Sequence, residues 1–332
     1  MTATIDPRQW LVFLRTEYLD SFIRDGGTSI KVVVPLDEDM RSGIERDISG
    51  LAETTGYVIA RVSAAETRVH MIDQLFFRVA EQIPWRQLSR KILVGLAKTA
   101  GYAPPAPEST APVVDGLAVA NNLDPSMVQM EARRWIQDQI LLQKHPTFRQ
   151  RSLAKDFRVA VTQLCLAELS GGPDGETISE VITDWLTGRN KAVAAVKPYQ
   201  IFARVTRSNA RHLLESLLLW IRFAGLPGLV ILLDLSRVAL ARNPRDGLVY
   251  YTKAAMLDSY EVIRQFIDAT DRMKGCLMIV MPALEFLDEE DSGRGIGTYD
   301  ALRFRVYDEI RDQRLVNPMT ALVRLSPGGN VA

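Results

Sequence analysis

Short apolar runs alternate with amphipathic stretches along most of this chain. Four runs lack a helical period and are mostly β-branched or aliphatic: IKVVV at 30–34, YVIARVS at 57–63, LVILLDL at 229–235 and CLMIVM at 276–281. Such continuous apolar runs are typical of strands in a parallel sheet that is covered on both faces. A fifth run, TALVRL at 320–325, follows near the end of the chain. The pattern therefore predicts five strands in one central parallel sheet.

The segments between these runs have helical periodicity. Asp6 and Pro7 form a favourable helix start, because the carboxylate can accept a free amide and proline suits the first turn. Helices are predicted over about 7–23, 41–55 (closed by Gly56), 66–98 as one long run, 125–189 in two or three pieces, 209–223, 253–271 and 298–311. Strands that alternate with helices indicate an α/β fold with right-handed crossovers.

The long helical region separates the second predicted strand from the third. Within it, GYAPPAPESTAPVV at 101–114 contains four prolines and predicts an exposed loop. We expect an N-terminal helix at 1–25, the first half of an α/β domain at 26–65, a helical insertion at 66–200 and the second half of the α/β domain at 201–332.

Composition and charge exclude several classes of protein. Of 332 residues, 47% are hydrophobic and 24% are charged, which is typical of a globular protein and not of a disordered one. Forty basic residues balance forty acidic ones, so no net charge attracts nucleic acid or an anionic membrane. The start MTATIDPRQW has no signal-peptide pattern, and the longest apolar stretch, 217–235, is interrupted by Arg222 and by a Gly/Pro turn. We expect a cytoplasmic protein without a membrane partner.

The few residues suited to metal or thiol chemistry are scattered. Cys165 and Cys276 are too few for a disulfide framework, and each lies in a pattern expected to be buried. The three histidines, His70, His145 and His212, lack the spacing of a metal pair on a helix. The sequence therefore predicts no metal site and no cysteine nucleophile. The acidic run at 288–291 is typical of a solvated loop.

The segment after the first strand carries the most information about function. A strand, a turn, a helix and a second strand form the layout of a P-loop nucleotide site, in which G-x-x-x-x-G-K-[ST] should fill the turn. This chain has P-L-D-E-D-M-R-S at 35–42 instead.

Longer segments of the chain resemble the P-loop ATP-binding proteins of bacteriophage-exclusion (BREX) defence systems, which are relatives of AAA+ and origin-recognition ATPases. The resemblance covers most of the chain. It rests on YLDSFIRDGGTSIKVVV, GYVIARVS, WLTGRN at 185–190, ARHLLESLLLWIRFAGLPGLVILLDLSRV, RGIGTYDALRFRV at 294–306 and NPMTALVRL at 317–325. It implies a P-loop NTPase-like, AAA+-type parallel sheet with a long helical insertion between the second and third strands.

Compared with that family, the nucleotide motifs of this chain are degenerate. Pro35 and Met40 stand at the two glycine positions, Arg41 at the lysine position and Ser42 at the hydroxyl position. Glycines are needed because backbone amides must curl around the phosphates, which side chains obstruct. In the third strand, Asp234 stands at the position of the magnesium-associated acid, whereas Leu235 replaces the glutamate that polarises water.

Three functional hypotheses follow. The first is a subunit without nucleotide chemistry and without a cofactor, which acts as a scaffold or regulator beside an active ATPase homologue, helicase or nuclease, within a homo- or hetero-oligomer. The second is a divergent ATPase that binds ATP and magnesium through Arg41, Ser42 and Asp234. The third is a DNA-binding adaptor that uses the basic segments 144–158 and 204–211. The resemblance also implies an interface or trans-acting role for three arginines, Arg294, Arg303 and Arg305, with surface residues on a helix as the alternative.

Overall fold

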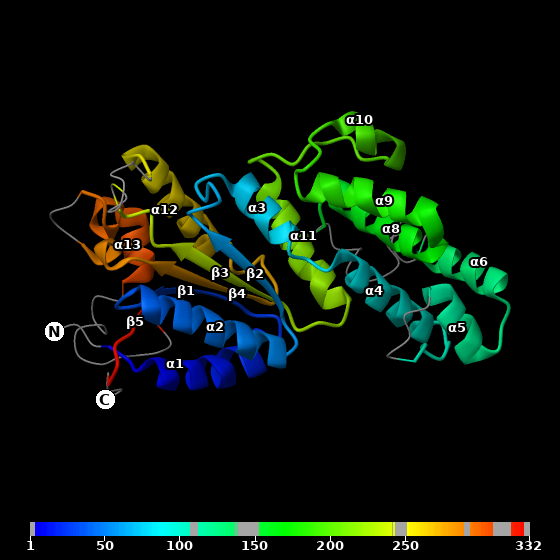
Figure 1. The fold of residues 1–332 in the computed structure, drawn as a ribbon, viewed down its shortest axis with the longest axis horizontal. Helices are drawn as coiled ribbons and strands as arrows, with labels where there is room; N and C mark the ends of the chain where they lie inside the picture. The colour runs from blue at the N-terminus through cyan, green and yellow to red at the C-terminus, as the bar shows by residue number, and fades with distance from the viewer. Residues whose placement is uncertain are drawn as a thin grey trace. The chain divides into compact units, whose positions relative to one another are not determined.

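The structure is a computed structural model that describes residues 4–106, 112–136, 138, 153–240, 242, 251–288, 293–307 and 320–328. The chain forms two compact units (Figure 1). Unit 1 comprises Met1–Val79 and Pro227–Ala332, and unit 2 comprises Ala80–Leu226. Unit 2 is thus one continuous segment placed between the two parts of unit 1. For comparison, the helical insertion predicted from the sequence covers residues 66–200.

Unit 1 is built on a five-stranded parallel sheet. The strands are β1 (Thr28–Val34), β2 (Val58–Ser63), β3 (Leu229–Leu235), β4 (Cys276–Pro282) and β5 (Leu322–Arg324). Their order is β2-β3-β4-β1-β5, and every neighbouring pair is parallel. β4 therefore lies between β1 and β3, the two strands expected to carry the nucleotide motifs. This arrangement confirms the predicted P-loop NTPase-like α/β class.

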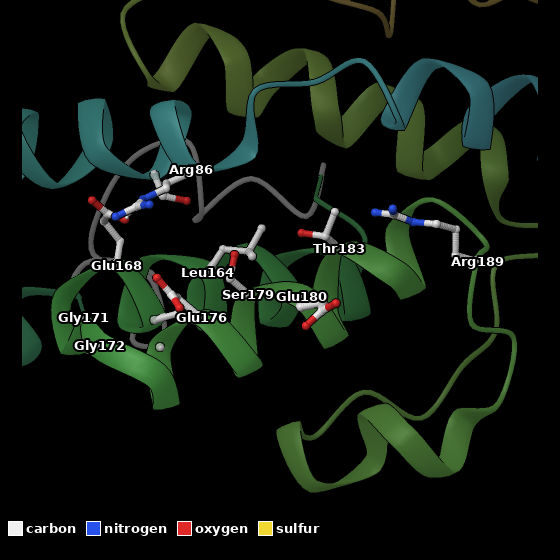
Figure 2. A pocket seen from close by; sticks show the side chains of 13 residues that line it. Arg86, Leu164, Glu168, Gly171, Gly172, Glu176, Ser179, Glu180, Thr183 and Arg189 are labelled. Carbon is white, nitrogen blue, oxygen red and sulfur yellow. Dashed lines mark hydrogen bonds and ion pairs between the residues drawn. The ribbon is translucent and has the colours of Figure 1, made fainter. Parts of the chain in front are cut away.

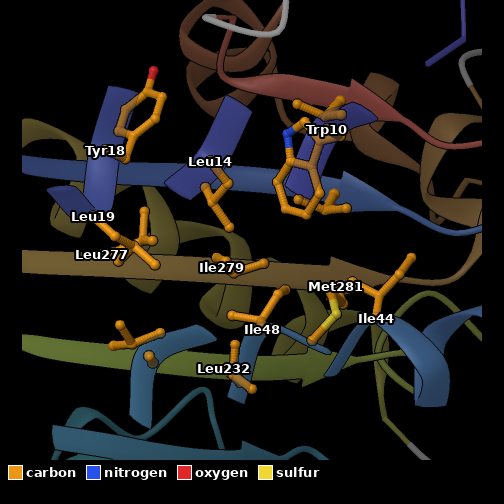
Figure 3. Packing of buried hydrophobic residues seen from close by; sticks show 14 of the residues in the cluster. Trp10, Leu14, Tyr18, Leu19, Ile44, Ile48, Leu232, Leu277, Ile279 and Met281 are labelled. Carbon is orange, nitrogen blue, oxygen red and sulfur yellow. The ribbon is translucent and has the colours of Figure 1, made fainter. Parts of the chain in front are cut away.

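One face of the sheet is covered by the N-terminal helices and by the helix that follows β1. These are α1 (Pro7–Phe13), its π-helical continuation η1 (Leu14–Phe22) and α2 (Glu38–Thr54). Figure 3 shows Trp10 of α1, Leu14 of η1 and Ile48 of α2 in one cluster with Ile279 of β4 and Leu232 of β3. All five side chains are 2% exposed or less, so they form a continuous core. The packing explains the helical apolar spacing of the first 23 residues.

The opposite face carries the other helices of unit 1. These are α3 (Ile72–Ala80), α12 (Lys253–Asp268) and α13 (Asp300–Val306), with short 3-10 turns η4 (Leu284–Leu287) and η5 (Ile296–Thr298). α12 contacts both β1 and α13. Alternate strand residues such as Ile231 and Met278 are fully buried as well. Burial on both faces is the reason these strands read as uninterrupted apolar runs.

Unit 2 is helical. It contains α4 (Trp85–Thr99), α5 (Val113–Asn121), α6 (Pro125–Ile136), α8 (Lys155–Ser170), α9 (Gly172–Leu186), α10 (Val193–Val196), η3 (Lys197–Tyr199) and α11 (Ala210–Phe223). α8 is the central helix and contacts α4, α5, α6, α9 and α11. A Cβ on Gly175 would collide with the carbonyl oxygen of Ala167, so glycine is required where α9 approaches α8.

The long helix predicted over 66–98 is wrong, because the structure has two helices there. α3 ends at Ala80 and α4 begins at Trp85. Pro84 directly precedes α4 and, since proline has no amide hydrogen and restricts the residue before it, it cannot continue a helix from α3. The indole nitrogen of Trp85 donates to the carbonyl oxygen of Ala80 at 2.9 Å and closes the turn. Among the described residues, no helix is long and apolar enough to cross a membrane.

Candidate functional site

The carboxyl ends of the strands in unit 1 surround one cavity. In the ladder, Ser63 at the end of β2 is paired with Asp234 of β3, which in turn is paired with Met281 of β4. The cavity has a volume of about 690 Å³ and is lined by the residues that follow β1, β2, β3 and β4. Ligands of open parallel sheets bind at this edge, so the position is that of a P-loop nucleotide site.

The turn after β1 is shorter than expected. β1 ends at Val34 and α2 begins at Glu38, three residues before the predicted helix start. Asp37 is the N-cap of α2, and its carboxylate accepts a hydrogen bond of 2.8 Å from the amide of Met40. Glu38 and Asp39 add two acids to the first turn. The end of α2 that would face a phosphate is therefore already capped by a carboxylate of the chain itself.

Arg41, which stands at the lysine position of the motif, lines this cavity. Its side chain is 6% exposed, and Nη1 lies 2.9 Å from Glu38 Oε2 and 3.6 Å from Asp234 Oδ1. Its Nη2 donates to the carbonyl oxygen of Pro282 at 3.3 Å, whereas its Nε, also buried, has no hydrogen-bond partner. The guanidinium thus connects α2 with the ends of β3 and β4. A planar guanidinium held by these groups differs from a lysine ammonium that is free to reach phosphates.

Asp234 is held by three groups of the protein. Its carboxylate accepts hydrogen bonds from Ser63 Oγ at 2.8 Å and from the amide of Ser236 at 2.9 Å, and it lies beside Arg41. The carboxylate therefore connects the ends of β2 and β3 with Arg41 of α2. The next residue, Leu235, is 1% exposed and belongs to the core.

The structure brings together part of the predicted site. Pro35, Arg41 and Asp234 line the cavity. Met40, Ser42 and Leu235 do not line the cavity. The sulfur of Met40 lies 3.5 Å from the amide nitrogen of Leu36 in the turn, and Ser42 is exposed. The hydroxyl position of the motif therefore does not face the cavity.

Sequence reasoning missed several residues that line the cavity. They are Leu36, Asp37, Glu38, Ser63, Ala65, Ser236, Arg237, Leu240, Ala283, Leu284 and Glu285. The available signal was their position, since each follows a strand end at the carboxyl edge of the sheet or begins the next helix. Asp37 could have been found as an N-cap, because an acid three residues before the first apolar helical position is a helix-start signal.

The charge of the cavity wall is mainly negative. Four carboxylates, those of Asp37, Glu38, Asp234 and Glu285, face two arginines, Arg41 and Arg237. Nearby, burial raises the pKa of Glu45, and the charge of Asp234 raises it further. Both the surplus of carboxylates and this shift indicate a site that disfavours an additional anion.

The described residues contain no group of three or more His, Cys, Asp or Glu side chains placed to hold a metal ion. Cys165 and Cys276 are buried free thiols, and burial raises the pKa of each to about 12, so neither is a reactive thiolate at neutral pH. His145, most of the acidic run 288–291, and residues 144–152 of the first basic segment lie outside the described residues.

The three arginines expected at an interface lie near α12 and α13. Arg294 donates to the backbone carbonyl oxygens of Val238, Ala239, Leu240 and Tyr251, at 2.7–3.3 Å. Arg305 on α13 forms a two-pronged ion pair with Asp268 at the end of α12, with Nη2 3.0 Å from Oδ2. The Nε atom of Arg303 is buried, whereas the residue as a whole is partly exposed. Arg294 and Arg305 thus have structural contacts within unit 1, and a role toward a neighbouring subunit stays a prediction.

The parallel order of the strands and the cavity at their carboxyl edge define a P-loop NTPase-like protein. A comparison with protein families agrees: residues 137–328, more than half of the chain, match the family described as BREX system ATP-binding protein BrxC/D. The chain belongs to this family. The matched segment includes Asp234, Leu235 and the three arginines, but not the turn after β1. No curated protein and no solved structure shows a significant match to the chain.

Proposed function

We propose that this chain is a BREX subunit that has lost nucleotide chemistry and acts by contact, as a scaffold or regulator of an active partner. The observation that carries the proposal is the position of Arg41, which is buried in the cavity and ion-paired with Glu38 and Asp234. The three carboxylates at the start of α2 support it, because they repel phosphates at the helix end that should attract them.

Hydrolysis is disfavoured by the same geometry. A catalytic carboxylate would have to follow Asp234, and that position is occupied by the buried side chain of Leu235. A core of strands and helices packed on both faces explains how the fold persists without the site. We expect the partner to be an ATPase homologue, helicase or nuclease of the same defence system, in a homo- or hetero-oligomer.

The test is calorimetry of the full chain with ATP and with ADP, each with and without magnesium. We expect no saturable binding and no phosphate release. Saturable binding at micromolar concentration would contradict the proposal. In that case, Arg41→Ala and Ser42→Ala identify the site: a loss of affinity in both indicates the divergent ATPase. Lys191→Ala, a change at an exposed position of unit 2, is the control.

The divergent ATPase is the second candidate, and one observation favours it. The Nε of Arg41 is buried and lacks a hydrogen-bond acceptor, which a phosphate oxygen could supply. The DNA adaptor stays a third hypothesis, for which Arg204 and Arg207 are exposed on the second basic segment. It predicts DNA affinity that falls steeply with salt.

A further inference from the structure

Residues 197–211 of unit 2, which we term the basic loop, carry a local excess of positive charge. They comprise η3, the loop that follows it and the start of α11, and contain four Lys or Arg residues and no Asp or Glu. Two other arginines of unit 2 are neutralised by acids. In the cavity between α4, α8 and α9, Arg86 meets Glu168 at 2.9 Å (Figure 2), and Arg189 is paired with Asp184 at 3.0 Å. The basic loop thus differs from the chain as a whole, whose formal net charge is zero.

Buried and exposed side chains alternate in the middle of the basic loop. Residues 201–206 have no regular secondary structure. Ile201 is fully buried and Ala203 is half-buried, whereas Phe202 and Arg204 are exposed. Alternation with a period of two is that of an extended chain. The side chains of Phe202 and Arg204 therefore leave the loop on the same, solvent-facing side, about 7 Å apart.

The backbone of the basic loop is fixed at three successive residues. Side chains hold these backbone groups through hydrogen bonds: the Phe202 amide donates to Asp156 Oδ1 at 3.1 Å, Trp185 Nε1 donates to the Ala203 carbonyl at 3.0 Å, and Asn209 Nδ2 donates to the Arg204 carbonyl at 2.8 Å. Asp156 belongs to α8 and Trp185 to α9. The negative charge of Asp156 offsets one of the four positive charges and leaves a surplus. Because the backbone is already held, a ligand that binds the exposed side chains has little loop to order.

The exposed side chains combine an aromatic ring with cations. Phe202 is 58% exposed, which is large for a phenylalanine on a fixed backbone. Within the described part of the chain, the side chains of Lys197 and Arg204 make no hydrogen bond and no ion pair. Arg207 lies exposed in the turn that Thr206 and Asn209 close, with the Thr206 amide 2.8 Å from Asn209 Oδ1. Rings on which bases stack, interleaved with cations that pair with phosphates, are typical of surfaces that bind single strands.

A double helix fits this surface less well. The bases of a duplex are already stacked on one another, so they leave no face for Phe202. Reading a major groove needs a helix with a continuous exposed face. The neighbouring helix α11 has none, because eight of its 14 residues are buried and His212 alone is exposed.

We propose that the basic loop binds single-stranded nucleic acid, with one base stacked on Phe202, the adjacent phosphate paired with Arg204, and further phosphates paired with Lys197 and Arg207. The proposal gives the DNA-adaptor hypothesis a defined surface and a defined form of nucleic acid. It does not depend on whether the cavity of unit 1 binds a nucleotide.

Fluorescence anisotropy of the full chain with a labelled oligothymidylate of about 20 nucleotides tests the proposal. We expect saturable binding, with a slope of log K against log salt of about −2, the value for three phosphates of a single strand. The same strand annealed to oligoadenylate should bind about tenfold more weakly, because its bases are stacked within the duplex. An oligouridylate of equal length shows whether a ribose strand binds more tightly than a deoxyribose strand, and saturable binding of either one supports the proposal.

Two variants separate stacking from charge. Phe202→Ala should weaken binding of the single strand about tenfold and leave the salt slope unchanged, because it removes a ring and no charge. Phe202→Trp should retain the affinity. Arg204→Ala should weaken binding about threefold and make the salt slope less steep by about 0.7, since one phosphate contact is lost. Both residues are exposed, so the fold of unit 2 does not depend on their side chains.

Matched controls lie elsewhere on the chain. Phe304 is 69% exposed on α13 beside Arg305, but Arg305 is paired with Asp268. Arg134 is exposed on α6 of unit 2. Phe304→Ala and Arg134→Ala should leave the affinity unchanged.

Three results would overturn the proposal: neither single strand reaches saturation, the duplex binds as tightly as the single strand, or Phe304→Ala weakens binding as much as Phe202→Ala. Saturable binding of ATP would contradict the loss of nucleotide chemistry in unit 1 and would change none of these outcomes.

Discussion

Lys31 is a buried charge inside an otherwise apolar strand. It lies in β1, is 2% exposed, donates to the carbonyl oxygen of Thr320 at 2.8 Å, and its Nζ is 4.6 Å from the centre of the Tyr18 ring. Burial lowers its pKa from 10.5 to about 8. The native state therefore holds the proton less tightly than the unfolded state does, and protonation of Lys31 destabilises the fold.

We expect Lys31→Met to stabilise the protein at pH 7. The shift corresponds to a cost of about 3 kcal/mol that is fully present below pH 8, and the lost contacts to Thr320 and Tyr18 offset part of it, which leaves a gain of about 1–2 kcal/mol. Between pH 8 and 10.5 the unfolded state binds more protons, so wild-type stability rises relative to the variant and the gain disappears. Urea unfolding at pH 7 and pH 10 measures this.

The same experiment on Lys191→Met, an exposed position, should show no such dependence on pH. The opposite result would be that Lys31→Met has a lower free energy of unfolding than the wild type at pH 7, and that this difference does not change with pH. It would show that Lys31 contributes to stability through its contacts and not through its charge.

The sequence predicts some of the residues that line the cavity at the carboxyl ends of the strands in unit 1, but it does not predict the contacts that these residues make. Asp234 could be placed because it ends a continuous apolar run, and Arg41 because it follows a recognisable strand and turn. Their ion pair could not be predicted, since β4 lies between β1 and β3 and the pairing of the strands becomes known only from the fold. Likewise, nothing in IKVVV indicates that Lys31 is buried, because a lysine in a strand can extend to solvent.

At the scale of the element, the sequence pattern predicts the bounds of strands well and the ends of helices poorly. β3 has the predicted bounds because Leu229–Leu235 is apolar between a glycine turn and polar residues. The sequence predicts the start of α2 three residues late, because Asp37, Glu38 and Asp39 resemble a polar loop by composition. Their physical role is different: one acid caps the helix and the other two complement its dipole.

This role of Asp37 is testable with a matched control. Asp37→Ala should lower the free energy of unfolding by about 1 kcal/mol, because the Met40 amide loses its acceptor. Asp39→Ala removes an equal charge from the same turn but no cap, and should cost less than about 0.5 kcal/mol. Equal losses in urea unfolding would mean that charge alone, and not the cap, stabilises the start of α2.

At the scale of the whole molecule, the family match spans parts of both units. Residues 137–328 include α8, α9 and α11 of unit 2 and strands β3, β4 and β5 of unit 1. Of the helices between β2 and β3, those from α8 to α11 are thus part of what relates this chain to its family, whereas α3 to α6 lie outside the match. The turn at 35–42 lies outside the match, so the proposal that it no longer binds nucleotide is supported by the geometry of Arg41 and Asp37 alone.

The division into units predicts how fragments behave. Ala80–Leu226 is continuous and contains its own core around α8, including Phe157, Val161 and Leu164, so we expect the isolated fragment to be helical and to unfold cooperatively. Met1–Val79 should not fold, because β1 pairs with β4 and β5, and β2 pairs with β3, all of which lie beyond residue 226. Circular dichroism and thermal unfolding of both fragments decide this. A disordered Ala80–Leu226, or a cooperatively folded Met1–Val79, would show that the folding units differ from these two compact units.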